Sequence, residues 1–307
     1  MSGPPPGWID PNPPSTVNPR AKVVLTVAGV VLTMIVIATL VVVVVHARGY
    51  SPDSGYGSNT VVLLGVDSEY PDAFTPSAVV DPVTASEHAA SEIATLAQQL
   101  PTSTERGVHV VAGTRPGLYG GTDRASACNA AAVANYLDTH VDEGRAWSHA
   151  IGIEPQQIPA YLNTLTPVIV NIDTWVTAHR FSTSGGIPFQ TVLQAGTPVM
   201  IDAVGVPRLH CKSGSPLIPP ANTNLAKLDD VRGTAWPDYA PQKVVAIAYA
   251  ASSAESPVSE FSILDLGSAE QIARKVGGTI NLGSTPDTGR LPDPASSNVP
   301  PRTRRTG

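Results

Sequence analysis

The chain has 307 residues, of which only 14% are charged, and its formal net charge at pH 7 is −6. Binding to nucleic acid depends on clustered Lys and Arg side chains that neutralise phosphates. Residues 46–289 carry 13 Lys and Arg against 23 Asp and Glu. We therefore expect no nucleic-acid partner.

The N-terminal part divides into a polar arm and an apolar segment. Residues 1–20 contain seven prolines and are predicted to form a disordered arm. Residues 23–45 carry no charge, and a helix of that length would reach about 34 Å, enough to cross a hydrocarbon core of about 30 Å. We predict a transmembrane signal-anchor helix at 21–46, with a cleaved signal peptide as the alternative.

The orientation of this anchor is predicted from the length of the chain on its C-terminal side. Positive charges flank both sides, with Arg20 and Lys22 before the segment and Arg48 after it, so the charge rule alone is nearly balanced. A long exported domain favours a cytoplasmic N-terminus and an extracytoplasmic C-terminal part at the cell membrane. We expect a flexible stalk at 47–59, a folded domain at 60–283 and a disordered, basic, Pro-rich tail at 284–307.

The domain itself mixes helix and strand signals. Helices are predicted after the Thr84–Glu87 capping box, from Asn129, from Asp142 to Gly152, from Pro155 or Pro159 to Leu165, and at 268–276. Strands are predicted at 108–111, 168–173, 174–179, 197–202, 206–211, 244–249 and 261–266. The strands at 197–202 and 206–211 should form one hairpin, and those at 244–249 and 261–266 a second antiparallel pair. Because the helices and strands are clustered, we expect an α+β domain with antiparallel β hairpins and several short helices.

The chain has two cysteines, Cys128 and Cys211, both in the folded domain. An even pair in an exported domain favours a disulfide over two free buried thiols.

Several motifs together resemble a known family. They are Gly113–Thr122 with Tyr119 at its centre, Leu165–Val168, Asp173–His179, Leu193–Thr197, Gly205–Cys211, Trp236–Tyr239 and Phe261–Asp265. This pattern, over about 70–278, is similar to that of an uncharacterised actinobacterial family of exported or membrane-tethered domains. The resemblance implies a location in the cell envelope and no assigned activity. The family usually has Cys-x-Cys where this chain has Cys211 and Ser213, which weakens any metal-binding interpretation.

The sequence contains none of the common catalytic or phosphate-binding motifs that we searched for. The best polar constellation is Asp173, His179, His210 and Cys211. It could form a nucleophilic set with Cys211 as a thiolate, or a zinc site built on His179, His210 and Cys211. The competing interpretation is that Asp173 and His179 only make hydrogen bonds that hold a strand turn. We expect neither a cofactor nor a metal.

Aromatic residues supply a second set of candidates. Tyr119 stands in a glycine-rich turn and Trp175 on a polar strand, and we expect both rings to be exposed for contact with a ligand or partner. Arg208 and His210 complete the candidate contact residues, whereas Trp147 is predicted to be core.

These features favour a non-enzymatic, membrane-anchored module that binds an envelope protein or a cell-wall ligand. The alternative is an extracytoplasmic hydrolase or metal-dependent enzyme that uses Asp173, His179 and His210.

Overall fold

The computed structural model describes residues 56–70, 72–80, 82–123, 126–247 and 256–281, together with Leu291. The predicted arm, the anchor segment, the stalk before residue 56 and all of the tail except Leu291 lie outside these residues. None of the helices in the described ranges is both long enough and apolar enough to span a membrane.

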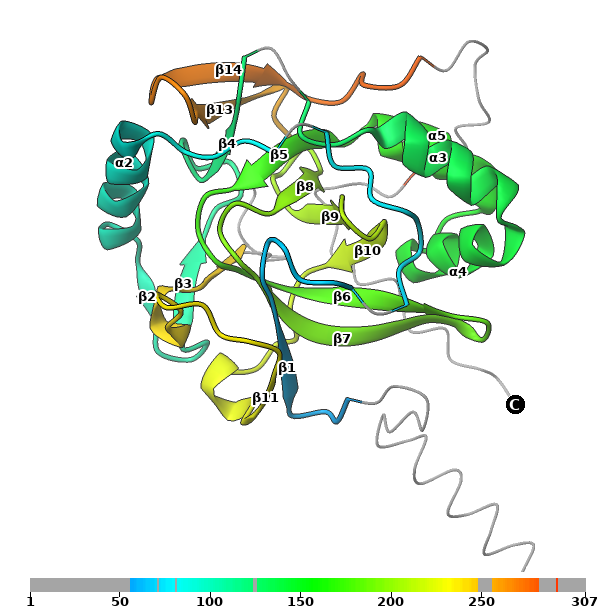
Figure 1. Cartoon of the computed structure of the whole chain (residues 1–307), viewed down its shortest axis with the longest axis horizontal. Helices are drawn as coiled ribbons and strands as arrows, with labels where there is room; N and C mark the ends of the chain where they lie inside the picture. The colour runs from blue at the N-terminus through cyan, green and yellow to red at the C-terminus, as the bar shows by residue number, and fades with distance from the viewer. Residues whose placement is uncertain are drawn as a thin grey trace, which may run out of the picture. The chain divides into compact units, whose positions relative to one another are not determined.

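The strands of the described part join into one mixed sheet (Figure 1). Its main path runs β11-β1-β7-β6-β10-β9-β8-β5-β4-β13-β14, while β12 pairs with β3 and β6, and β2 pairs with β3. The strands are β1 Thr60–Leu64, β2 Thr102–Ser103, β3 Val108–Val111, β4 Tyr119–Gly121, β5 Thr166–Val170, β6 Thr174–Ser182, β7 Gly185–Leu193, β8 Pro198–Ile201, β9 Pro207–His210, β10 Ser215–Ile218, β11 Asp230–Arg232, β12 Val245–Ile247, β13 Glu260–Asp265 and β14 Gln271–Lys275.

Short helices lie on two sides of this sheet. Three of them, α3 to α5, gather at one end, and α2 lies alone on another side (Figure 1). The helices are α2 Glu87–Gln98, α3 Ala130–Thr139, α4 Val141–Ile151 and α5 Ile158–Asn163, with 3-10 turns η1 Pro155–Gln157, η2 Leu225–Lys227 and η3 Pro241–Lys243.

Local chemistry explains several helix ends. The Asn129 side chain accepts from the backbone N–H of Ala132 and so begins α3, as predicted. Gly152, in the left-handed conformation with φ 81°, ends α4 as predicted. The start of α2 differs by two residues from the expected capping box, because Ser86 is the N-cap residue and accepts from Ala89.

The α+β class and the antiparallel hairpins β6–β7, β8–β9 and β13–β14 are confirmed, but the sheet as a whole is mixed rather than antiparallel. Strand β1 runs parallel to both β7 and β11, β12 runs parallel to β3 and β6, and β13 runs parallel to β4. These pairs join strands that lie far apart in the sequence, so no local turn motif predicts them. The predicted pairing of 244–249 with 261–266 is wrong for the same reason.

The predicted helix at 268–276 is a strand. Ser268 belongs to the tight turn between β13 and β14, where Asp265 Oδ1 accepts from the N–H groups of Gly267 and Ser268. The apparent helix cap is therefore a turn. Side chains of β14 alternate between exposed and half-buried, which is the period of a strand.

The predicted disulfide between Cys128 and Cys211 is confirmed, with 5.6 Å between the two Cα atoms. It joins the segment before α3 to the residue after β9, inside an apolar cluster that also holds Trp147. Trp147 is fully buried, as predicted, and donates from Nε1 to the carbonyl oxygen of Gly214.

Gly113, at the start of the Gly-rich segment after β3, makes a close backbone contact with Gly205 in the turn between β8 and β9. A Cβ atom on Gly113 would lie 2.4 Å from the carbonyl oxygen of Val204, and one on Gly205 would lie 2.2 Å from that of Gly113. Only residues without side chains allow the two backbones to approach so closely. The segment from Gly113 is therefore structural, as its turn-like pattern indicates.

Reduction of the disulfide should destabilise the domain strongly. Its cysteines are 83 residues apart, and the chain-entropy model gives about 4–5 kcal/mol for a loop of that size. Urea unfolding of the full chain with and without reductant measures the loss. A Cys128→Ser/Cys211→Ser variant should show no response to reductant, and an equal response of both proteins would contradict the assignment.

Candidate functional site

The two histidines of the predicted constellation lie on strands of the same sheet, separated by one strand, and both are buried. His179, on β6, contacts the carbonyl oxygen of Pro216 through Nδ1 at 2.9 Å, and His210, on β9, contacts Ser213 Oγ at 2.8 Å. Strand β10 lies between β6 and β9, and its Ser215 hydroxyl donates to the carbonyl oxygen of His179 at 2.6 Å.

Their environment keeps both imidazoles neutral. Burial lowers the pKa of His179 to about 4. Burial, with a smaller contribution from the charge of Lys212, lowers the pKa of His210 to about 4. The His179 ring links β6 to β10, and the His210 ring holds the turn between β9 and β10.

Asp173 does not join the histidines. It directly precedes β6, and the six residues of extended chain that separate it from His179 span about 20 Å. Its carboxylate accepts from the N–H of Ala195 at 2.8 Å and from Trp236 Nε1 at 2.9 Å. Burial raises the pKa of this carboxyl group.

The expected catalytic arrangements are therefore not assembled. Cys211 is bonded to Cys128 and cannot supply a thiolate. Across the described residues, no three His, Cys, Asp or Glu side chains are grouped so that they could hold a metal ion.

The two aromatic candidates are not exposed, which corrects the sequence-based expectation. Tyr119 is buried, and its hydroxyl donates to the carbonyl oxygen of Gly205. Trp175 is fully buried and donates from Nε1 to Gln190 at 3.0 Å, with the guanidinium of Arg106 4.8 Å from the ring centroid. Neither ring is available to a ligand, because Tyr119 is 2% exposed and Trp175 is 0% exposed.

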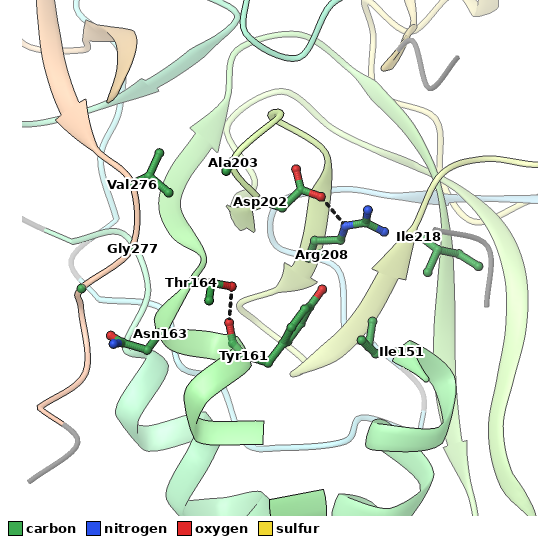
Figure 2. Close-up of a pocket in the computed structure, with 11 residues that line it drawn as sticks. Ile151, Tyr161, Asn163, Thr164, Asp202, Ala203, Arg208, Ile218, Val276 and Gly277 are labelled. Atoms are coloured by element: carbon green, nitrogen blue, oxygen red, sulfur yellow. Dashed lines mark hydrogen bonds and ion pairs between the residues drawn. The ribbon is translucent and has the colours of Figure 1, made fainter. Parts of the chain in front are cut away.

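Arg208 borders a cavity of about 360 Å³ between the β8–β9 hairpin and α5 (Figure 2). Its Nε donates to Asp202 Oδ2 at 2.7 Å, and both side chains are buried. Asp202 Oδ1 also accepts from the N–H groups of Val204 and Val206. The ion pair thus holds the predicted hairpin turn. Tyr161 stands beside it (Figure 2), and burial raises the pKa of that phenol to about 12.

Larger open space lies next to α2. Two adjoining cavities, of about 720 and 670 Å³, share Ile93 of α2 and the loop residues Asn171 and Ala195. We call the pair the α2 groove. Sites of this size, about 300–1,000 Å³, hold small ligands in other proteins.

The two halves of the groove differ in charge. The Asp173 lobe, of about 670 Å³, contains Asp173, Trp236 and Lys243. The Lys212 lobe, of about 720 Å³, contains Lys212, Thr197 and His210. Asp173 and His210, both predicted from the sequence, therefore belong to the groove but to different lobes.

The sequence interpretation missed Lys212, Thr197 and α2 as parts of a site. Thr197 ends the family motif Leu193–Thr197, so the sequence did point to it. Nothing in the sequence singles out Lys212 except its position after Cys211. Ala89 is the only fully buried residue of α2. The half-buried apolar side chains of this helix, such as Ile93 and Ala97, both pack against the core and border the groove.

Acid should destabilise the domain through its two buried histidines. Their folded-state pKa values lie below the unfolded value of about 6.5, so the unfolded chain binds more protons between those values. Their contribution to the free energy of unfolding is fully present above pH 6.5. It is lost as the pH drops to about 4, by roughly 3 kcal/mol for each histidine. Denaturant unfolding at several pH values gives the free energy of unfolding as a function of pH. The two histidines should contribute two protons to its slope in this range. His210→Gln should remove one of them.

Comparison with known proteins adds a family. A family model described as a domain of unknown function (DUF6777) matches residues 109–277, which include β3 to β14 and the floor of the α2 groove. No curated protein and no solved structure matches significantly. The resemblance to an uncharacterised domain is thus confirmed, while an actinobacterial origin stays a prediction. Because the match covers more than half of the 307 residues, the chain belongs to the DUF6777 family of domains of unknown function.

Proposed function

We propose that this chain is a single-pass, membrane-anchored protein of the cell envelope whose outer domain binds a ligand or partner in the α2 groove. The apolar segment 23–45 and the disulfide support the anchor and the export. The outer domain acts by binding rather than by catalysis.

The observation that carries this proposal is the groove itself. Its walls come from a weakly buried helix, and its floor comes from two loops after the buried strands β5 and β7. Loops held by a rigid sheet are common positions for ligand contact. The few polar groups stand among apolar side chains, which is the usual composition of a binding site.

The enzymatic alternative has less support. It requires Asp173, His179 and His210 within hydrogen-bond reach of one another. Asp173 lies far along β6 from His179, and the side chains of both histidines are engaged by β10 and the turn before it.

The proposed topology predicts which positions an impermeant thiol reagent can reach. The native cysteines are bonded, so a single introduced cysteine reports its own location. In intact cells we expect labelling of Ser184→Cys, an exposed position between β6 and β7. Ser15→Cys in the N-terminal arm should react only after lysis. Labelling of Ser15→Cys in intact cells would reject this orientation.

A photo-reactive amino acid at Ala94 tests the groove. Ala94 is exposed on α2 and borders the Asp173 lobe. In living cells we expect a discrete adduct at Ala94 and none at Val141, which is 61% exposed on α4. Ile93→Trp, which fills space shared by both lobes, should abolish the Ala94 adduct. Equal adducts at both positions, or adducts insensitive to Ile93→Trp, would argue against a groove-bound partner.

A further inference from the structure

Two polar side chains of the Lys212 lobe, Thr197 and Lys212, belong to the same end of the β8–β9 hairpin. In that hairpin Val199 pairs with His210, and the N–H of Cys211 donates to the carbonyl oxygen of Pro198 at 3.2 Å. Thr197 directly precedes β8, Lys212 lies in the turn after β9, and both residues line the Lys212 lobe.

The hydroxyl of Thr197 is a buried donor that is not used. The residue is 2% exposed, and its Oγ1 has no hydrogen-bond partner among the described residues. A buried hydroxyl without a partner costs roughly 1–3 kcal/mol. A ligand that accepts a hydrogen bond at this position would remove that cost.

The charge of Lys212 is also not neutralised. Its ammonium group donates to the carbonyl oxygen of Val66 at 3.1 Å, which uses one of three donor positions. Within the described part of the chain no carboxylate forms an ion pair with it. Among the described residues that line this lobe, Asp67 is the only acidic one, and it is exposed. The adjacent His210 adds no charge at neutral pH.

The remaining walls of the lobe are mostly apolar. They include Val66, Val79, Val83, Ile93, Ile169 and Leu266. The lobe therefore combines the Lys212 ammonium and a few neutral polar groups, among them Thr197, Ser77 and Thr84, with a largely apolar surface.

We infer that the Lys212 lobe binds a long-chain carboxylate, with its head group between Lys212 and Thr197 and its hydrocarbon chain along the apolar walls. The inference rests on the proposed function of the α2 groove and names the ligand class of that site.

The number of donors favours a carboxylate over a phosphate. A carboxylate has two oxygens, which the Lys212 ammonium and the Thr197 hydroxyl can satisfy together. A phosphate monoester presents three strong acceptor oxygens and carries close to two negative charges, and proteins usually meet it with clustered Arg or a helix N-terminus. Among the residues that the structure describes, no arginine lines this lobe.

Photoaffinity labelling of the full chain in native membranes tests this inference. The probe is a saturated fatty acid with a diazirine in its chain, and the labelled peptides are mapped by mass spectrometry. We expect labels on residues of the Lys212 lobe, at least about tenfold above those from the methyl ester of the same probe. Lys212→Met should reduce labelling about tenfold, the size expected for losing one charged hydrogen bond. Lys227→Met, an exposed lysine in η2, should leave labelling unchanged.

Thr197→Val separates a ligand role from a structural one. If the hydroxyl serves the ligand, this variant should label several-fold less, while its thermal midpoint without the probe stays equal or rises. Equal labelling by acid and ester, unchanged labelling of Lys212→Met, or stronger labelling by a phosphate-headed probe would each overturn the carboxylate assignment. If the Ala94 adduct is still observed in that case, the proposal that the groove binds a partner remains supported, and only the ligand class is wrong.

Discussion

The carboxylate of Asp173 holds together the chain segments that form the floor of the α2 groove. One oxygen accepts from Ala195 in the β7–β8 loop, and the other accepts from the indole of Trp236 in the segment before η3. The carbonyl oxygen of the same residue accepts from Val245 at the start of β12. Through Ala195 this one side chain positions the loop that both lobes share, and so also positions Thr197.

That arrangement divides the domain into a rigid part and an adaptable part. The β6–β7 hairpin, the helices α3 to α5 and the disulfide are packed into continuous apolar clusters. Helix α2 contributes one fully buried residue and borders cavities on more than one side. A binding wall of this kind can adjust to a ligand while the sheet keeps the polar groups in place.

Buried polar residues in this domain have two different roles. The Asp202–Arg208 pair, His179 and His210 bond to neighbouring protein groups and stabilise turns and strand contacts. Thr197 and Lys212, which line a cavity, retain unused hydrogen-bonding capacity. Residue type alone did not distinguish these roles. The sequence favoured the histidines and Arg208 as site residues over Thr197 and Lys212.

Local features of this protein could be predicted from the sequence alone, because they depend on neighbouring residues. Asn129 begins α3, Gly152 ends α4, and Ala203 to Gly205 close the β8–β9 hairpin. The α+β class and the disulfide could be predicted from composition and pattern. Tertiary structure alone decided that β1 inserts parallel to β7, that 271–275 is a strand and that Trp175 is buried. These outcomes depend on pairing between distant strands and on what covers each face of the sheet. The α2 groove is of the same kind, because its floor, its wall and Lys212 come from segments that only folding brings together.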